Sequence, residues 1–283
     1  MSSRYTRAVT MNLDQFDAVL LDLDGTIYHE EHALPGAMEL IRRLQREKRR
    51  FACLTNSTSS PERIAARLLR MGADVGEEAI YTAGAAAVDY ILNPNFAGSD
   101  LADPPNNHVP RVYSLATEGV HDLLEGKVRW VSRADEGCDV VLVGTPTSVF
   151  ATEDRQRVAL EILRRERSAK LVGICADRVY PSPRGIEFGS GALTMMLAYA
   201  ANATPTFTGK PEAIFFRELC RRLGVGTERC LLIGDNLESD IAGGKKVGMT
   251  TILTLTGVAA REDISGFPPG MQPDAVIRDL TCL

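Results

Sequence analysis

Four polar clusters in the sequence bring together carboxylates, a hydroxyl, an amide and an ammonium group. Two or more acids at one place repel each other unless a cation lies between them, and oxygen donors without histidine favour Mg²⁺. Lys210, Thr55 and backbone N–H groups could then hold the non-bridging oxygens of a phosphoryl group. The clusters are Asp22-Leu23-Asp24-Gly25-Thr26, Thr55-Asn56-Ser57, Gly209-Lys210-Pro211, and Gly234-Asp235-Asn236 with Asp240.

The clusters follow apolar segments that we expect to form buried strands. Helices with apolar faces are expected between them, and this alternation is typical of an α/β fold with a parallel sheet. Ligands bind at the carboxyl edge of such sheets. The expected strands are Phe16–Leu23, Phe51–Leu54, Cys230–Gly234 and Thr250–Leu255, with Phe207 before the third cluster; the expected helices are Pro35–Lys48, Ser60–Met71, Pro211–Leu223 and Glu238–Val247.

The middle of the chain has shorter strands and helices. We expect a discontinuous domain formed by residues 1–82 and 205–283, with an inserted α/β domain at 83–204. Asn93–Pro110 is expected to be an exposed loop and Met1–Leu13 a loose leader. The strands expected in the insert are Arg111–Leu115, Val128–Val131, Val140–Val143 and Leu171–Ile174, and the helices are Glu118–Leu124, Thr152–Arg167 and Gly191–Asn202.

Each cluster alone has a plainer interpretation. Asp-x-Asp-Gly occurs in calcium loops, but a strand precedes it here and the twelfth position from Asp22 is Ala33, not Glu. The segment Thr55-Asn56-Ser57 alone is usually a turn or helix cap, and Gly-Asp at a strand end is commonly a turn. Their joint occurrence in this order, each after an apolar strand, argues against coincidence.

Composition excludes several classes of protein. The 283 residues include 45% hydrophobic and 24% charged residues, enough for a sizeable core, and the net charge of −5 argues against nucleic-acid binding by overall basicity. The cysteines form no C-x-x-C pair and lie mostly in apolar segments, which favours free thiols in a reducing, cytoplasmic compartment. They are Cys53, Cys138, Cys175, Cys220, Cys230 and Cys282.

No membrane segment or signal peptide is expected. Phe188–Gly209 is uncharged, but Asn202 and Pro205 interrupt it, so a buried helix followed by a strand is the favoured interpretation. Near the N-terminus, acidic residues interrupt any apolar region that could serve as a signal peptide. These residues are Asp14, Asp17 and Asp22.

The four clusters strongly resemble the motifs of the haloacid dehalogenase (HAD) superfamily, over nearly the whole chain. Asp22–Thr26 fits the first motif, Thr55-Asn56 the second, Lys210 the third, and Gly234-Asp235 with Asp240 the fourth. The resemblance implies a Rossmann-like parallel-sheet core with an inserted cap. It also implies a Mg²⁺-dependent hydrolase that acts on a small phosphorylated metabolite.

The resemblance also assigns roles within the site. Asp22 would be the nucleophile that forms a phospho-aspartyl intermediate, and Asp24 the general acid and base. Mg²⁺ would be held by the Asp22 carboxylate, the Asp24 backbone carbonyl and the Asp235 carboxylate. Thr55, Asn56 and Lys210 would bind the phosphoryl group, and Asp240 would order the waters of the metal or Lys210.

Spacing selects a branch of this superfamily. Only 30 residues separate Asp24 from Thr55, which leaves room for a small flap at about Ile27–Pro35, whereas 153 residues lie between Asn56 and Lys210. A cap inserted at the second place is what the IIA subfamily carries, a group that includes 4-nitrophenyl, phosphoglycolate, pyridoxal phosphate and nucleotide or sugar monophosphatases. In relatives this cap often mediates dimers, so a homodimer through the cap is a further expectation.

The cap departs from the pattern of the subfamily, so the substrate is not defined. Members often have Asn shortly before Asp where this chain reads Ile174-Cys175-Ala176-Asp177, and the segment Val143-Gly144-Thr145-Pro146 lacks the usual Asp. The loop Asp177–Gly185 aligns with the one that faces the leaving group in relatives. Its candidate substrate-binding residues are Asp177, Arg178 and Tyr180, although Tyr180 could instead only pack within the cap.

Other functions fit less well. Dehalogenases of the superfamily lack the second acid, here Asp24, and phosphonatases use a cap lysine, whereas the insert has only Lys127 and Lys170 without a motif around either. A phosphomutase would usually carry its cap in the first gap. A binding or regulatory protein that kept the fold and lost turnover is a further alternative, against which the intact set of Asp22, Asp24, Lys210 and Asp235 argues.

Overall fold

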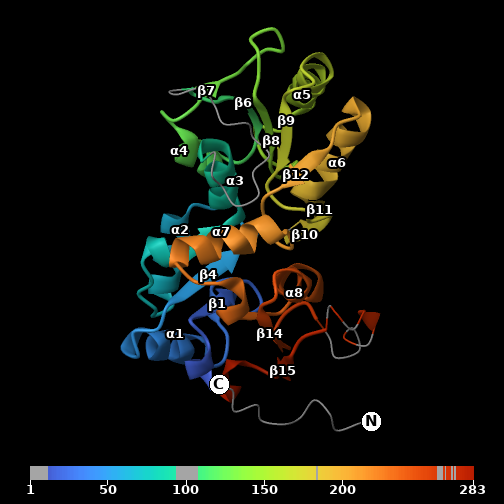
Figure 1. Cartoon of the computed structure of the whole chain (residues 1–283). Coiled ribbons are helices and arrows are strands. Elements are labelled where there is room, and N and C mark those ends of the chain that lie inside the picture. Colours follow the sequence, from blue (N-terminus) through green and yellow to red (C-terminus); the bar gives the residue numbers. More distant parts are fainter. Residues whose placement is uncertain are drawn as a thin grey trace. The chain divides into compact units, whose positions relative to one another are not determined.

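The computed structural model describes residues 12–93, 108–182, 184–259, 264, 266–268, 270 and 272–283. The chain forms two compact units, coloured along the sequence in Figure 1. The first comprises Met1–Thr55, Pro61–Tyr81 and Lys210–Leu283, and the second Asn56–Ser60 and Thr82–Gly209. Most of the expected leader and most of the loop expected at Asn93–Pro110 lie outside the described residues.

The first unit is built on a six-stranded sheet with the order β15-β14-β13-β1-β4-β5. The four pairings from β15 to β4 are parallel. Strands β1 and β13 are buried along their whole length, which matches their continuous apolar sequences. The strands are β1 (Ala18–Asp22), β4 (Phe51–Thr55), β5 (Ile80–Thr82), β13 (Cys230–Gly234), β14 (Thr250–Thr254) and β15 (Ala275–Ile277).

Helices cover both faces of this sheet, as alternate residues of β13 show. Leu231 and Ile233 belong to the apolar core that also contains Ile41 and Leu44 of α1. Leu232 faces the other way, toward Gly244 of α8, where an added Cβ would come within 2.7 Å of the leucine side chain. The helices are α1 (Ala37–Arg46), α2 (Pro61–Arg70), α7 (Ala213–Leu223) and α8 (Ala242–Lys246).

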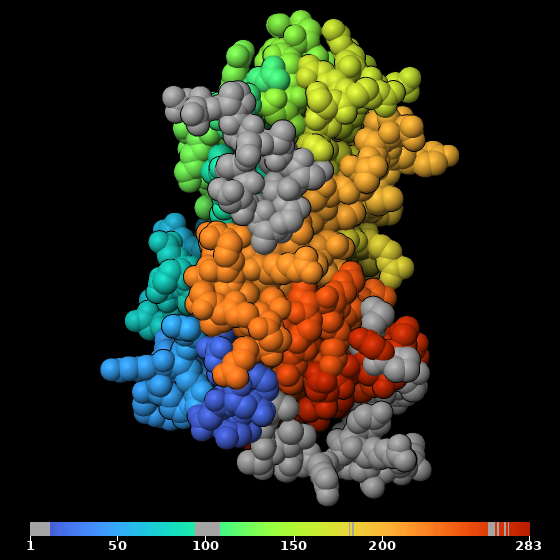
Figure 2. All heavy atoms as spheres, in the orientation of Figure 1, coloured from blue at the N-terminus to red at the C-terminus, as the bar shows by residue number. Residues whose placement is uncertain are grey.

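Helix α7 begins just after Lys210 and holds the third cluster against the sheet. Its Phe215 and Phe216 are fully buried, and the Phe215 ring lies 5.0 Å from that of Tyr81 at β5. In Figure 1 this helix lies in front of β4, and in Figure 2 its atoms form part of the visible surface of the first unit. Lys210, which lies shortly before α7, is therefore held in place by a packed helix as well as by its own contacts.

The second unit has its own sheet, with the order β12-β9-β8-β6-β7 and parallel pairings throughout. A separate antiparallel hairpin, β10–β11, precedes α6. The strands are β6 (Arg111–Leu115), β7 (Arg129–Trp130), β8 (Val140–Val143), β9 (Lys170–Gly173), β10 (Val179–Ser182), β11 (Gly185–Phe188) and β12 (Pro205–Phe207). The helices are α3 (Ala83–Leu92), α4 (Glu118–Leu124), α5 (Glu153–Arg165) and α6 (Ser190–Ala201).

The α/β fold with a parallel-sheet core is confirmed. The expectation of a loop at Asp177–Gly185 is wrong, because residues 179–182 form β10 and pair with β11 from Gly185 onward. The helix expected at Glu238–Val247 begins with a π-helical turn, Leu237–Ile241, before α8. Strand β5 and helix α3 were not expected from the sequence at all.

The uncharged segment Phe188–Gly209 forms α6 and then β12. Nowhere in the described part of the chain is a helix both long and apolar enough to cross a membrane. The segment is only partly buried, however: Leu193 and Leu197 of α6 lie in the core of the second unit, whereas Tyr199 is 92% exposed.

The packing of α1 gives a test of the core. Leu44 is fully buried in the apolar core of the first unit, so Leu44→Ala should lower the free energy of unfolding by about 2–5 kcal/mol. Leu69, a helical leucine of α2 that is 58% exposed, provides the matched control, and Leu69→Ala should change this free energy by no more than about 0.5 kcal/mol. Urea denaturation followed by circular dichroism measures both, and equal losses would contradict this account of the core.

Candidate active site

The first cluster lies where β1 ends. Asp22 is the last residue of this buried strand and pairs in register with Leu54 of β4. The chain then turns tightly, with Gly25 at φ 83° and the N–H of Ile27 donating to the carbonyl of Leu23 at 2.8 Å. Such a positive φ favours glycine. The turn presents the Asp24 side chain, which is exposed, two residues beyond the buried Asp22.

Lys210 lies at the centre of the site and is 3% exposed. Its Nζ donates to Oδ1 of Asp22 at 2.5 Å and to Oδ1 of Asp240 at 2.7 Å. The other oxygen of Asp22 accepts from the Thr26 hydroxyl at 3.2 Å. Both oxygens of the Asp22 carboxylate are thus oriented by donors from different elements.

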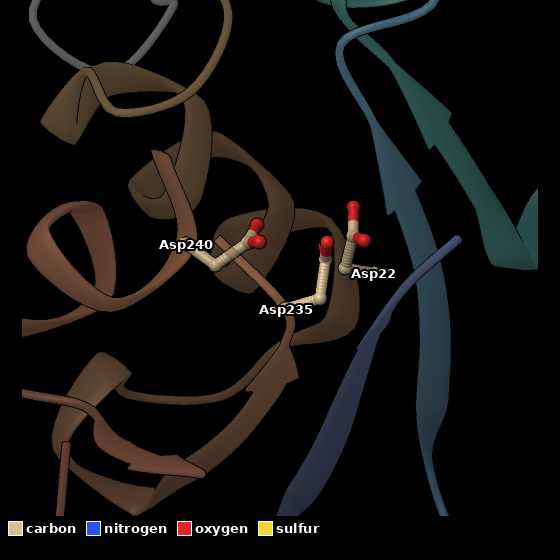
Figure 3. A group of neighbouring side chains, drawn as sticks. All are labelled: Asp22, Asp235 and Asp240. Carbon is tan, nitrogen blue, oxygen red and sulfur yellow. The ribbon is translucent and has the colours of Figure 1, made fainter. Parts of the chain in front are cut away.

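Asp235 and Asp240 complete the group, and Figure 3 shows their carboxylates beside that of Asp22. Asp235 follows β13, and its Oδ2 accepts the N–H of Val258 at 2.6 Å. Asp240 lies on the π-helical turn, where its Oδ2 accepts the N–H of Asn236 at 3.2 Å while its Oδ1 accepts from Lys210. Ligand oxygens of the three aspartates lie within 4.8 Å of one another.

This cluster carries more negative than positive charge. Burial raises the pKa of the Asp22 carboxyl to about 7; the charge of Lys210 opposes this shift and that of Asp235 adds to it. Burial also raises the pKa of Asp235 and of Asp240, with further increases from neighbouring carboxylates. Burial alone would lower the pKa of Lys210, but Asp22 and Asp240 together raise it above its usual range.

The donor set fits a hard divalent cation. Three buried carboxylates share one ammonium group, so full ionisation leaves unbalanced negative charge that a cation would compensate. The donors are oxygens alone, as Mg²⁺ prefers. Asp240 accepts hydrogen bonds from Lys210 and Asn236 through its two oxygens. Asp22 ends β1, and Asp235 directly follows the adjacent strand, β13.

Two neighbouring positions complete this group of residues in the first unit. Thr55 is the last residue of β4, directly beside β1, and is 4% exposed. Asp24 is exposed, yet surrounding protein atoms desolvate its carboxyl enough to raise its pKa, against the opposing charges of Arg67, Lys210 and His29. Asp22, Thr55 and Asp235 therefore lie at the carboxyl ends of adjacent strands of one sheet, and Lys210 and Asp240 join them through their contacts. The strand before Lys210, β12, pairs with β9 and does not belong to this sheet.

The remaining predicted site residues lie in the second unit. The Asn56 side-chain amide donates to both carboxylate oxygens of Asp177, at 3.2 and 3.1 Å. The Tyr180 hydroxyl is 2.6 Å from that of Thr147, and Arg178 is exposed. The predicted roles of these residues in substrate binding stay predictions.

Sequence reasoning missed several residues that shape the site. Gly257 touches Asp235 so closely that an added Cβ would lie 1.9 Å from its Oδ2, and the Thr256 hydroxyl donates to the carbonyl of Gly25 at 2.6 Å. Both residues lie in the segment Leu255–Val258, which directly follows β14. Arg67 of α2, whose charge acts on Asp24, had no signal in the sequence beyond a helical position.

Comparison with known proteins agrees with this geometry. Residues 19–127 match a family model described as "Haloacid dehalogenase-like hydrolase", and residues 207–283 match one described as "HAD-hyrolase-like". An acid sugar phosphatase of Staphylococcus aureus is 30% identical over 260 residues, which cover 91% of this chain and 94% of that protein. A 5′-nucleotidase of Bacillus subtilis is 29% identical over 251 residues, covering 88% and 91%.

Solved structures show the same architecture along almost the whole chain. A 4-nitrophenylphosphatase from Thermotoga maritima superposes with a TM-score of 0.81 at 27% identity, over 95% of this chain and 96% of that one. A glycerol phosphate phosphatase from Mycobacterium tuberculosis, in complex with magnesium, gives a TM-score of 0.81 at 26% identity, over 96% and 78%. The chain therefore belongs to the haloacid dehalogenase-like hydrolases, as a phosphatase of subfamily IIA.

Proposed function

We propose that this enzyme is a Mg²⁺-dependent phosphomonoesterase that hydrolyses a small phosphorylated metabolite through a phospho-aspartyl intermediate on Asp22. The observation that carries the proposal is the contact of Asp22 with Lys210 inside a buried group of carboxylates. Lys210 holds one oxygen of Asp22 in place, and its charge favours the ionised carboxylate that attacks, against the effect of burial. The magnesium complex of a related phosphatase supports the choice of metal.

The reaction divides into two displacements at phosphorus. First, an Asp22 oxygen bonds to phosphorus while the bond from phosphorus to the leaving oxygen breaks, and Asp24 gives that oxygen a proton. Then Asp24 takes a proton from water, the water oxygen bonds to phosphorus, and the bond to Asp22 breaks. The products are the alcohol and inorganic phosphate, and Asp22 is again a carboxylate.

The other residues bind and orient in this proposal. Thr55 and Lys210 hold phosphoryl oxygens, and Asn56 contributes from the second motif. The Asp22 and Asp235 carboxylates and the Asp24 carbonyl would hold Mg²⁺, which when bound stabilises negative charge on the phosphoryl oxygens. Asp240 orders Lys210, in agreement with their 2.7 Å contact.

Two alternatives are tested by one measurement. A silent regulatory protein of this fold would release no phosphate, and a phosphotransferase would need an acceptor other than water. Mg²⁺-dependent release of phosphate from 4-nitrophenyl phosphate without an added acceptor distinguishes all three. The complete set of Asp22, Asp24, Lys210 and Asp235 argues against the silent protein.

The site in the first unit binds the phosphoryl group of the substrate, and a screen must identify the leaving group. Related phosphatases are named for nucleotides, acid sugars, 4-nitrophenyl phosphate and glycerol phosphate. A phosphate-release screen over sugar phosphates, nucleotides, glycerol phosphate, phosphoglycolate and pyridoxal phosphate would select among them. We propose that the second unit recognises the leaving group of the substrate. The residues proposed to bind it are Asp177, Arg178 and Tyr180, in the segment 177–185.

Two further expectations remain proposals. The six free cysteines favour action in the reducing cytoplasm. A homodimer through the cap is supported by large apolar side chains left exposed on one hairpin and one helix of the second unit. These are Val179, Ile186, Phe188, Met195, Met196 and Tyr199.

The nucleophile gives the sharpest test. Asp22→Asn keeps the size of the side chain but removes the attacking charge, so turnover of 4-nitrophenyl phosphate should fall at least about 10³-fold. Asp154→Asn, at a position whose side chain is 88% exposed on α5, is the matched control and should retain full activity. If Asp22→Asn kept more than a tenth of normal turnover, Asp22 could not be the nucleophile.

The metal site gives a second test. Asp235→Asn should weaken Mg²⁺ binding, measured by calorimetry, and should raise the Mg²⁺ concentration needed for activity or abolish activity. Ca²⁺ should bind but support little turnover, because its larger and looser coordination shell misplaces the attacking carboxylate. Full activity in excess chelator would refute the proposed metal dependence.

Substrate selection gives a third test. Tyr180→Ala removes the partner of Thr147, and Arg178→Ala removes an exposed charge. Both variants should change kcat/KM unequally across the substrate panel, while 4-nitrophenyl phosphate hydrolysis stays within about tenfold of normal. If each variant reduced every substrate by one common factor, the segment would be structural only.

A further inference from the structure

Arg67 of α2 makes three contacts with the small flap that follows the first motif. The flap is the hairpin of β2 (Tyr28–His29) and β3 (His32–Ala33). The Arg67 guanidinium lies over the Tyr28 ring, 4.2 Å from its centroid, and donates to the carbonyl of Glu30. Its Nε is 3.4 Å from the Glu31 carboxylate. One side chain thus reaches the ring of β2 and both residues of the turn, Glu30 and Glu31.

The flap needs support from outside itself. Its two strands are two residues long each, and an isolated hairpin even of ordinary length is marginally stable in water. Its turn residues are exposed, and Glu30 has a φ of 49°, a conformation that costs energy for a residue other than glycine. Arg67 is anchored by Ile64 and Leu68, which bury α2 in the core, so it offers a fixed point.

Tyr28 links the flap to the turn that carries Asp24. Its carbonyl accepts the N–H of Gly25 at 2.8 Å, its N–H donates to the carbonyl of Leu23 at 3.1 Å, and it forms a β-bridge with Asp24. The Tyr28 ring is fully buried in the apolar core of the first unit. Core packing and the Arg67 guanidinium therefore orient this ring.

We propose that Arg67 is a positioning residue that holds Asp24 in place through Tyr28 and the flap. The proposal rests on the proposed function, in which Asp24 protonates the leaving oxygen. Arg67 would not touch the reacting atoms; it would fix the buried ring whose backbone brackets the Asp24 turn. Loss of Arg67 would then impair the proton transfer more than the attack by Asp22, whose own contacts are to Lys210 and Thr26.

The leaving group separates these two effects. An alkoxide such as that of glycerol needs a proton as it departs, whereas 4-nitrophenolate departs without one. The value of kcat/KM reports the steps up to release of the leaving group, so the later attack of water, which both substrates share, does not enter it. The ratio of kcat/KM for glycerol phosphate to that for 4-nitrophenyl phosphate therefore measures the action of Asp24.

Arg67→Ala should lower this ratio by about tenfold or more, within the range that general acid catalysis contributes. Arg67→Lys, which keeps a cation over the ring but not the fork of donors, should recover part of the loss. Arg70→Ala is the matched control, because Arg70 lies on the same helix, is largely exposed and, among the described residues, pairs with the exposed Glu31 at 3.7 Å. It should leave the ratio unchanged. Thermal melting identifies any variant that fails to fold, and Arg67→Met, which keeps the apolar stem, then replaces Arg67→Ala.

Asp24→Asn distinguishes failure of this inference from failure of the proposed function. If Asp24→Asn leaves the ratio unchanged, the assigned role of Asp24 is wrong. If Asp24→Asn lowers the ratio but Arg67→Ala lowers both substrates equally, Arg67 is merely structural and the inference is overturned. In the double variant, Arg67→Ala should add little to the loss from Asp24→Asn. Fully additive losses would show that Arg67 acts independently of Asp24, and would also overturn it.

Discussion

The buried contact of Lys210 with Asp22 and Asp240 is the constraint on which the site depends. Taking an ammonium group and carboxylates out of water costs several kcal/mol per ion, which only close opposite charges and further hydrogen bonds recover. Here Lys210 is 3% exposed and contacts two carboxylates at 2.5 and 2.7 Å. One cation still leaves the three aspartates in excess, so the protein alone does not neutralise the cluster. This residual negative charge is what a bound divalent cation would compensate.

The order of the strands explains why these residues meet. Strand β1 lies between β13 and β4, so Asp22 at its end has Asp235 on one side and Thr55 on the other. These residues lie far apart in the sequence. They meet because β13, β1 and β4 are parallel, so that the carboxyl ends of the three strands lie at one edge of the sheet. Helix α7 then places Lys210 at the same edge from a fourth segment. The site is thus a property of the sheet topology more than of any single motif.

The sequence predicted elements well where burial is continuous. Strands β6, β8 and β13 and helix α4 have the expected bounds, because each strand is a short apolar segment with clear ends and the helix has a clear polar start. Hairpin β10–β11 could not be predicted in this way: Val179, Ile186 and Phe188 are exposed, so no alternation of buried and exposed residues marks it. Helix α3 is rich in alanine and lacks an amphipathic pattern, since it is buried nearly all round. The π-helical turn also has no known signal in its sequence.

The candidate site was predicted from residue types, but its supports were not. Asp22, Lys210, Asp235 and Asp240 follow from motifs at strand ends, whereas the contacts of Gly25 and Gly257 with Asp235 depend on how two loops approach each other. An added side chain at either glycine would collide with the Asp235 carboxylate, at 2.4 or 1.9 Å from its Oδ2. Backbone proximity of this kind arises from tertiary structure, and single residues in a sequence carry little trace of it.

The environments of the two acids in the first motif explain how residues two positions apart can take different roles. Asp22 is buried and has both oxygens held by donors, which suits a carboxylate that must attack in one direction. Asp24 is exposed on a turn, where it can exchange protons with a leaving group and with water. Because Asp24 is exposed, its orientation depends strongly on the backbone of its turn. That backbone is bonded to Tyr28, and the position of Tyr28 in turn depends on Arg67. Because Asp24 must be exposed to exchange protons, the site depends on Arg67 to hold the turn that carries Asp24.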